Sequence, residues 1–377
     1  MKVIRLKVIM KKISIVLAVS IVLRCAAWIP LSGTFIENTA VLSAGLIMPE
    51  GVAGYYAAQV KAILNAKPQA APSEETPTEA EPPEETATQA APETTTTEST
   101  SPVKNNQPNP AEKGGDIEEK QYGETNETIK YKNVVVLNRT KSHQVNIEET
   151  LSKKADLSIQ KNDKPYVLIF HTHTTETYQE SDLGWYPKDF KERSLNSEKN
   201  MIRVGDEICK QLESAGIGVI HDKNVYDNPS YTGAYERSGK KIDEYLKKYP
   251  SIQIILDIHR DSIQYDSGTK SKPTAEINGK KAAQIMIISG CQEGDITGFD
   301  DWGYNLRFAL QLQKIAETDN PGLMRPLFFT TRKYNMHKSH CSLLLEMGSD
   351  GNTLEEAVYS GELIGKALVK LCADYTK

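Results

Sequence analysis

The feature that most limits what this chain can fold into is a long stretch without core-forming side chains. Between Leu64 and Val103 there is no Val, Ile, Leu, Met or aromatic residue, and Glu, Thr, Ala and Pro fill the stretch instead. Such a segment buries too little apolar surface to offset the entropy lost on ordering. We therefore expect residues 66–128 to be a disordered acidic linker, and a spacer role is favoured over a binding motif.

The N-terminal residues are typical of a membrane segment. A basic tail, residues 1–12, precedes an apolar stretch at residues 13–31 that only Arg24 interrupts. This length is close to the roughly 20 residues of a membrane-spanning helix. Positive charge lies before the stretch and acidic residues follow it, which places the N-terminus inside. An uncleaved single-pass anchor in the cell membrane is favoured over a cleaved secretion signal. Residues 32–65 then form a juxtamembrane segment, and the rest of the chain is extracytoplasmic.

The remaining residues, 129–377, are long enough for one α/β domain. Apolar runs of strand length alternate with segments of helical periodicity, and the runs are apolar on both faces. Continuous apolar strands are typical of a mainly parallel sheet with helices on both faces. The expected strands are 131–137, 166–170, 217–220, 252–258, 283–289 and 342–345, and the expected helices are 200–215, 231–248, 304–317 and 354–373.

Three of the expected strands end in polar residues. Phe170 is followed by His171-Thr172-His173, Ile258 by His259-Arg260-Asp261, and Leu345 by Glu346. In open α/β sheets, binding sites form outside the carboxyl ends of the strands. Three separate segments are therefore expected to bring His, His and Glu to one edge of the sheet.

This combination of residues predicts a catalytic zinc site. Such sites use three protein ligands and one water. His173 and His259 are the expected histidine ligands, and Glu176, three residues after His173, is favoured as the third. Glu346 is then free to act as general base on the attacking water, whose pKa the metal lowers to about 7. The predicted chemistry is hydrolysis at a carbonyl.

The ligand set has alternatives. Glu198, just before the helix expected at 200–215, could replace Glu176, since some zinc amidases take their acidic ligand from such a position. His171 shares a face with His173 and could be a ligand, although a hydrogen-bonding role beside the metal is at least as consistent with its position. Asp261 could orient His259 or pair with Arg260.

Other polar residues are candidates for contact with the substrate. Arg260 and Arg237 could bind a substrate carboxylate, although Arg237 also fits a charge on a helix surface. His221 ends a strand and is a weaker candidate for substrate contact. His337 and His340 precede Glu346 in a loop and could supply an acid to a leaving amine, or could lie on the surface.

The chain resembles the stage II sporulation protein P family. The resemblance covers residues 132–377 together with the arrangement of anchor and linker before them. It is carried by the segments HTHTTETY, NMIRVGDEI, GIGVIHD, NPSYTGAYERS, ILDIHRDS, INGKKAAQIMIISG, NLRFALQLQ, PGLMRPL and LLLEMGSDGNTLEEA.

The resemblance implies a membrane-anchored peptidoglycan hydrolase of endospore-forming bacteria. Its domain would be similar to zinc-dependent N-acetylmuramoyl-L-alanine amidases, with residues 129–377 as the catalytic domain. His173 and His259 fall where those amidases place zinc histidines, and Glu346 matches their catalytic glutamate. HTHTTE replaces the G-H-G-G loop of ordinary amidases, which leaves the acidic ligand open.

The implied reaction is cleavage of the amide between the glycan lactyl group and the stem peptide, with endopeptidase activity on cross-links also ascribed to the family. The implied role is forespore engulfment with two sporulation partners, the lytic transglycosylase protein D and the membrane protein M. The expected partners are peptidoglycan and membrane, and no nucleic acid. Two other functions stay open: a zinc carboxypeptidase in which Arg260 holds a terminal carboxylate, and a non-catalytic scaffold that binds the cell wall.

Overall fold

The structure is a computed structural model that describes residues 110–160 and 162–377. The expected anchor, the juxtamembrane segment and residues 66–109 of the expected linker lie outside the described residues. Within the described part, none of the helices combines the length and the apolar character needed to cross a membrane.

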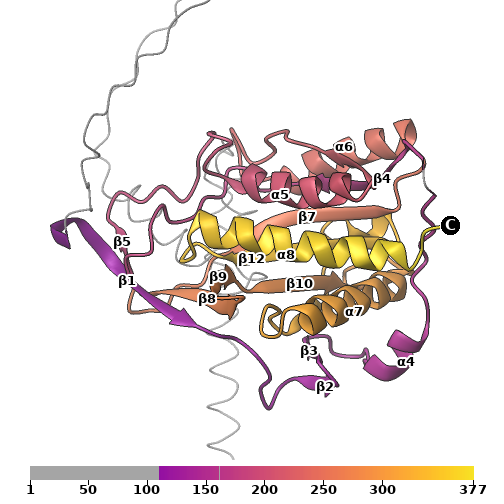
Figure 1. The fold of residues 1–377 in the computed structure, drawn as a ribbon, viewed down its shortest axis with the longest axis horizontal. Coiled ribbons are helices and arrows are strands. Elements are labelled where there is room, and N and C mark those ends of the chain that lie inside the picture. The colour runs from indigo at the N-terminus through magenta and orange to yellow at the C-terminus, as the bar shows by residue number, and fades with distance from the viewer. Residues whose placement is uncertain (1–109, 161) are drawn as a thin grey trace, which may run out of the picture. The chain divides into compact units, whose positions relative to one another are not determined.

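A sheet of eight strands runs through the middle of the described part (Figure 1). In spatial order its strands are β2 (Ile129–Tyr131), β3 (Val134–Asn138), β11 (Leu327–Thr330), β10 (Ile285–Gly290), β12 (Cys341–Ser349), β7 (Ile254–Asp261), β4 (Pro165–Phe170) and β6 (Gly218–His221). The three strands that were expected to carry the site, β12, β7 and β4, are direct neighbours and run parallel. Their carboxyl ends therefore meet at one edge.

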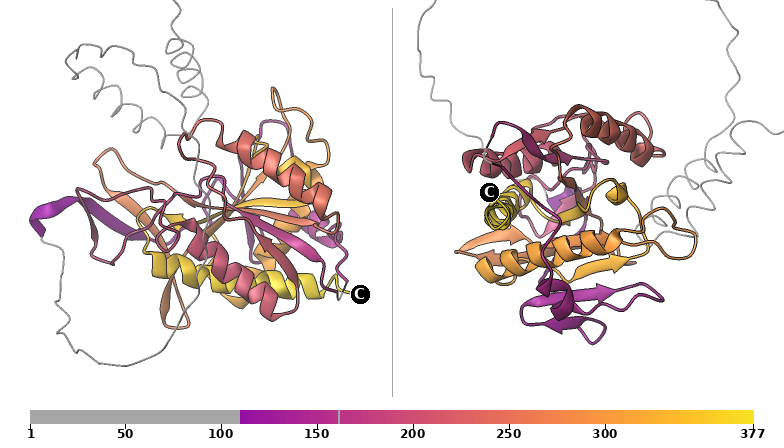
Figure 2. Two further views of the ribbon diagram at one scale, coloured as in Figure 1. Left: turned by 90° about the horizontal axis from the view of Figure 1, so that it is seen from above. Right: turned by 90° about the vertical axis from the view of Figure 1, so that its right-hand side faces the viewer.

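Helices cover both faces of this sheet (Figure 2). The main core lies on the face covered by α5 (Met201–Ser214), α7 (Trp302–Asp319) and α8 (Leu354–Ala373). On the other face α6 (Ala234–Lys248) covers a smaller cluster that includes Phe170, Ile242 and Ile255. A short helix, α4 (Ile147–Ser152), and two 3-10 turns, η1 (Pro110–Glu112) and η2 (Met336–Lys338), complete the helical elements of the described residues.

Side-chain alternation along β7 decides which face carries the site. Ile254, Leu256 and Ile258 belong to the main core, whereas Ile255 belongs to the cluster under α6. Because successive strand residues point to opposite faces, Asp257 and His259 share the α6 face with Ile255.

The sheets are mixed in direction, which corrects the expectation of a mainly parallel sheet. β10 runs antiparallel to β12, and β2 runs antiparallel to β3. The chain passes from β7 to β10 through β8 (Lys270–Ile277) and β9 (Lys280–Ala283), which pair antiparallel around Asn278 and Gly279. With no crossover helix between them, β10 returns in the opposite direction to β7.

A second sheet has the order β5–β1–β8–β9, with β1 at Lys113–Lys120 and β5 at Trp185–Pro187. β1 lies inside residues 66–128, the segment expected to be disordered, so residues 113–120 are ordered where the sequence predicts a linker. β1 buries no side chain, and it is held by backbone pairing with β5 and β8. The buried Lys272 of β8 adds ionic contacts, with Nζ 2.7 Å from Glu356 and 3.4 Å from Glu119 of β1. All these partners are distant in sequence, and the composition of β1 gives no sign of them.

Most of the other expected elements are present with shifted ends. The strand expected at 131–137 is a hairpin of β2 and β3 that turns at Lys132, whose φ is +55°. The helix expected at 200–215 is α5, and Asn200 caps it by accepting a hydrogen bond from Ile202 N–H at 3.1 Å. α8 has the expected ends, and a capping box between Thr353 and Glu356 begins it.

Candidate active site

His173 lies in the turn that follows β4, and its side chain is almost completely buried. The backbone N–H of Glu176 donates to the His173 carbonyl at 3.1 Å, so the turn folds Glu176 back toward the strand end. The His173 ring stacks on Tyr231, with ring centroids 4.2 Å apart, and meets His259 edge-on at 5.2 Å.

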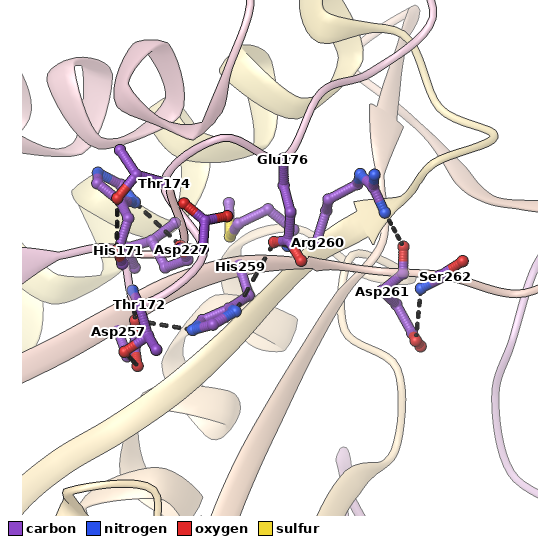
Figure 3. Close-up of polar contacts among 12 residues, drawn as sticks. His171, Thr172, Thr174, Glu176, Asp227, Asp257, His259, Arg260, Asp261 and Ser262 are labelled. Atoms are coloured by element: carbon purple, nitrogen blue, oxygen red, sulfur yellow. Dashed lines mark hydrogen bonds and ion pairs between the residues drawn. The ribbon is translucent and has the colours of Figure 1, made fainter. Parts of the chain in front are cut away.

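Glu176 and His259 point toward one another (Figure 3). The Glu176 Oε2 atom lies 3.7 Å from His259 Nδ1, and it also accepts a hydrogen bond from the backbone N–H of Arg260 at 3.2 Å. Burial raises the pKa of Glu176, and the charges of His259 and Arg260 act against that rise. The carboxylate is thus held beside the two histidines by a main-chain donor.

Asp257 lies on the other side of His259. Its Oδ1 atom is 2.8 Å from His259 Nε2, although this contact is too poorly aligned to count as a hydrogen bond. The same carboxylate accepts from the backbone N–H of Thr172 at 2.8 Å and from its hydroxyl at 2.7 Å. Burial alone would lower the pKa of His259, but the adjacent Asp257 outweighs it and raises the pKa to about 9. Asp257 therefore connects the end of β4 to the middle of the site.

Glu346 comes from the third strand end. In the parallel ladder of β12 and β7 it is the partner of His259, and its Oε2 atom is buried with no hydrogen-bond partner among the described residues. Burial is the main cause that raises the pKa of Glu346 to about 8, Asp261 adds to the rise, and His259 opposes it. A buried carboxyl with a raised pKa is typical of a general acid or base.

The donor set suits zinc. Nδ1 of the buried His173 has no hydrogen-bond partner in the described part of the chain. Burial also lowers the pKa of His173, which favours the neutral imidazole that binds metals. Among residues 110–160 and 162–377, however, no three His, Cys, Asp or Glu side chains form a ready-made metal cluster. The fit is one of ligand type: His173, His259 and Glu176 are the kinds of side chain that bind catalytic zinc.

Two residues expected near the ligands have other partners. His171 is buried behind the site, with Nδ1 2.9 Å from the Ile258 carbonyl and Nε2 2.9 Å from His221 Nε2. His221 in turn has its Nδ1 atom 2.9 Å from Asp206 of α5, so its two ring nitrogens are taken by His171 and Asp206. Glu198 is on the surface, with a side chain 75% exposed and 3.5 Å from Arg203.

The arginines predicted to bind substrate donate hydrogen bonds to main-chain carbonyls. Arg260 donates to the carbonyls of Thr177 at 2.6 Å, Glu192 at 2.9 Å and Asp261 at 3.3 Å. Arg237 donates in the same way to carbonyls of the loop before α6, including that of Tyr226 at 2.7 Å. Both guanidinium groups therefore brace the segments that surround the site.

Of the remaining candidates, Asp261 lies near enough to Glu346 to help raise its pKa, whereas His337 and His340 have partners elsewhere. Asp261 accepts from Arg325 at 3.0 Å and does not orient His259, a position that Asp257 takes. His340 lies 2.6 Å from Asp156 and stacks on Tyr304, and His337 is exposed beside Phe299.

Sequence reasoning missed Asp257, Tyr231 and Tyr235. A signal for Asp257 was present, because it is a charged residue within an apolar strand, two positions before His259 and hence on the same face. Tyr231 lies in the loop before α6 and Tyr235 in the first turn of α6, and no local pattern marks either as a site residue.

The family model "Stage II sporulation protein P (SpoIIP)" matches residues 54–369. The chain belongs to the stage II sporulation protein P family. A curated relative, stage II sporulation protein P of Bacillus subtilis (strain 168), is 32% identical over 205 residues. That alignment covers 52% of this chain and 48% of the relative, so the chain matches about half the length of that family member.

Solved structures with a similar arrangement include N-acetylmuramoyl-L-alanine amidases. One from Nostoc punctiforme is 12% identical, with a TM-score of 0.33 over 57% of this chain and 98% of that one. Another from Clostridium difficile 630 is 13% identical, with a TM-score of 0.33 over 57% of this chain and 97% of that one.

Proposed function

We propose that this chain is a zinc-dependent peptidoglycan hydrolase that cleaves the amide between the glycan lactyl group and the stem peptide. The observation that carries the proposal is the convergence of His173, His259, Glu176 and Glu346 at three neighbouring strand ends. Membership of the stage II sporulation protein P family supports a role in endospore formation.

In this proposal His173, His259 and Glu176 hold the metal. Zinc, when bound, would polarise the scissile carbonyl and lower the pKa of the attacking water. Asp257 orients His259, and carboxylate partners of this kind fix a histidine ligand for its metal. Glu346 takes the proton from the attacking water and gives it to the leaving nitrogen.

The position of Arg260 argues against a carboxypeptidase. That reaction needs a cation that is free to bind the terminal carboxylate of a peptide. The Arg260 guanidinium instead donates to three main-chain carbonyls. Amide cleavage inside a larger substrate, including endopeptidase action on cross-links, makes no such demand on it.

We also propose the setting that the sequence predicts. Residues 13–31 would anchor the chain in the cell membrane, and residues 129–377 would act outside it on peptidoglycan during forespore engulfment. The expected partners are the sporulation proteins D and M.

One experiment separates the alternatives. The full chain, purified in detergent, would be incubated with peptidoglycan with and without a zinc chelator, and the products identified by mass spectrometry. Free stem peptides that disappear with chelator support the amidase, whereas opened cross-links indicate an endopeptidase. Loss of single terminal residues would favour the carboxypeptidase. A zinc-free protein that binds peptidoglycan and releases nothing would leave only the scaffold.

A further inference from the structure

Three tyrosines surround the predicted site on the α6 side of the sheet. Tyr231 stacks on His173, and it is 39% exposed. Tyr235 meets the His173 ring edge-on at 5.5 Å and lies nearly parallel to the His259 ring at 6.3 Å. Tyr334 stacks on Tyr235 at 4.9 Å. The rings of both expected zinc histidines thus face Tyr235.

The position of Tyr235 is fixed by an unusual loop. Tyr334 and Asn335 have positive φ angles of 38° and 60°, which a bulky tyrosine rarely adopts. The Asn335 amide donates to the Tyr235 carbonyl at 2.9 Å and to the Ser238 hydroxyl at 3.2 Å. Strained backbone of this kind persists where the surroundings impose it, often at functional sites.

Helix α6 makes room for this contact with a glycine. A Cβ atom added at Gly239 would lie 2.7 Å from Oδ1 of Asn335. Glycine inside a helix is less favourable than alanine, because it loses more conformational freedom on folding. The loop therefore has a strained backbone, and the helix contains a poor helix former, at the place where Tyr235 and Tyr334 are stacked.

The Tyr235 hydroxyl has no hydrogen-bond partner among the described residues. It is not completely enclosed by them, so a bound substrate could reach it. A tyrosine hydroxyl keeps its proton at neutral pH, so the unpaired Tyr235 hydroxyl is available as a hydrogen-bond donor.

We propose that Tyr235 donates a hydrogen bond to the carbonyl oxygen of the scissile amide as negative charge develops on that oxygen. The inference rests on the proposed amidase function. The water oxygen bonds to the carbonyl carbon, Glu346 takes the water proton and passes it to the nitrogen, and the C–N bond breaks. Tyr235 keeps its own proton throughout, and its contribution is a donor already in place for the developing charge.

The test is Tyr235→Phe in the full chain, which keeps the ring that packs on His173. With a soluble muramoyl-peptide as substrate, kcat should fall by about 10²–10³-fold, the usual effect of losing one such donor. KM should stay within about twofold, and zinc content and melting temperature should be unchanged. Tyr245→Phe is the matched control, because Tyr245 is on the same helix and packs against the cluster under α6, away from the site.

The outcomes separate the inference from the proposed function. If the wild-type chain releases no stem peptides, the proposed function fails. If it does, and Tyr235→Phe turns over at the same rate or changes only KM, the donor role is wrong. Should Tyr235→Phe misfold, Asn335→Gly supplies the second test. Glycine keeps the positive φ and removes the amide contacts, so kcat should fall with zinc retained, and an unchanged kcat would overturn the proposal.

Discussion

Glu346 and His259 are paired residues on two adjacent parallel strands, β12 and β7. Their side chains project to the same face, and burial helps to raise the pKa of Glu346 to about 8. This pairing places the proposed base beside a proposed zinc ligand through backbone register alone.

Replacing Glu346 with Gln should remove turnover and leave the metal. The amide is close in size to the carboxyl but cannot take a proton from water, and general base catalysis is typically worth about 10²–10⁴-fold. The measurement is kcat on a muramoyl-peptide together with zinc content by atomic absorption. A Glu346→Gln chain with full activity would exclude this residue as the base.

Changes at the acidic ligand should separate Glu176 from Glu198. Glu176→Ala should lower zinc content as much as His173→Ala or His259→Ala, because Glu176 lies 3.7 Å from His259 in a buried position. Glu198→Ala is the matched control, because the Glu198 side chain is 75% exposed and pairs with Arg203. Zinc measured after dialysis decides the question. The ligand assignment is wrong if Glu198→Ala loses metal and Glu176→Ala retains it.

Asp257→Asn should weaken zinc binding without removing a ligand. The change takes away the charge beside His259 Nε2, and partners of this type typically contribute 10–100-fold to metal affinity. A titration against a zinc chelator of known affinity measures the shift. An unchanged zinc affinity would mean that Asp257 does not orient His259 for the metal. Its hydrogen bonds with Thr172 would then serve only to hold the end of β4 in place.

Gly205→Ala should destabilise the domain. A Cβ at this position in α5 would lie 2.5 Å from His221 Nε2 and 2.7 Å from His171 Nε2, and overpacking of this kind costs about 1–3 kcal/mol. Gly303→Ala in α7 is the comparison, since no neighbouring atom of the described residues lies within 4 Å of the added Cβ and alanine is the better helix former there. Denaturant unfolding should show opposite signs for the two changes.

Glu293 should make stability depend on pH in the acid range. Hydrogen bonds from the Ser142 hydroxyl, the Lys141 N–H and the Thr331 hydroxyl lower the pKa of Glu293 to about 2. A lowered folded-state pKa gives stability that is fully present above the unfolded value of about 4.3 and is lost as pH falls toward 2. Thermal melts of Glu293→Gln should therefore show less acid sensitivity over this range than the wild type. Equal slopes would contradict the assignment.

The strand ends were predictable because two local signals coincide there. Continuous apolar runs identify β4, β7 and β12, and the polar residues that follow each run give His173, His259 and Glu346. The family resemblance stated from the sequence is confirmed by the match over residues 54–369.

The features that the sequence does not predict depend on contacts between segments that are distant in the chain. β1 is charged and exposed, and its pairing with β5 and β8, together with the lysine contacts of Glu119, orders it. The partners of Arg237 and Arg260 are main-chain carbonyls of loops, and the sequence does not show where those loops lie. Tyr235 is unremarkable in sequence, and the left-handed backbone of Tyr334 and Asn335 decides its place beside the histidines.

The antiparallel partner of β12 has an evolutionary consequence. β12 is paired on both sides, with β7 in one direction and β10 in the other, and Glu346 is aligned with His259 and with Met286 at once. An insertion of one residue between Cys341 and Leu345 would shift the register by one. The Glu346 side chain would then point into the main core, and Leu345 would take its position in the site. Length variation among related chains should therefore accumulate in the loops around this strand, while the number of residues from Cys341 to Glu346 stays constant.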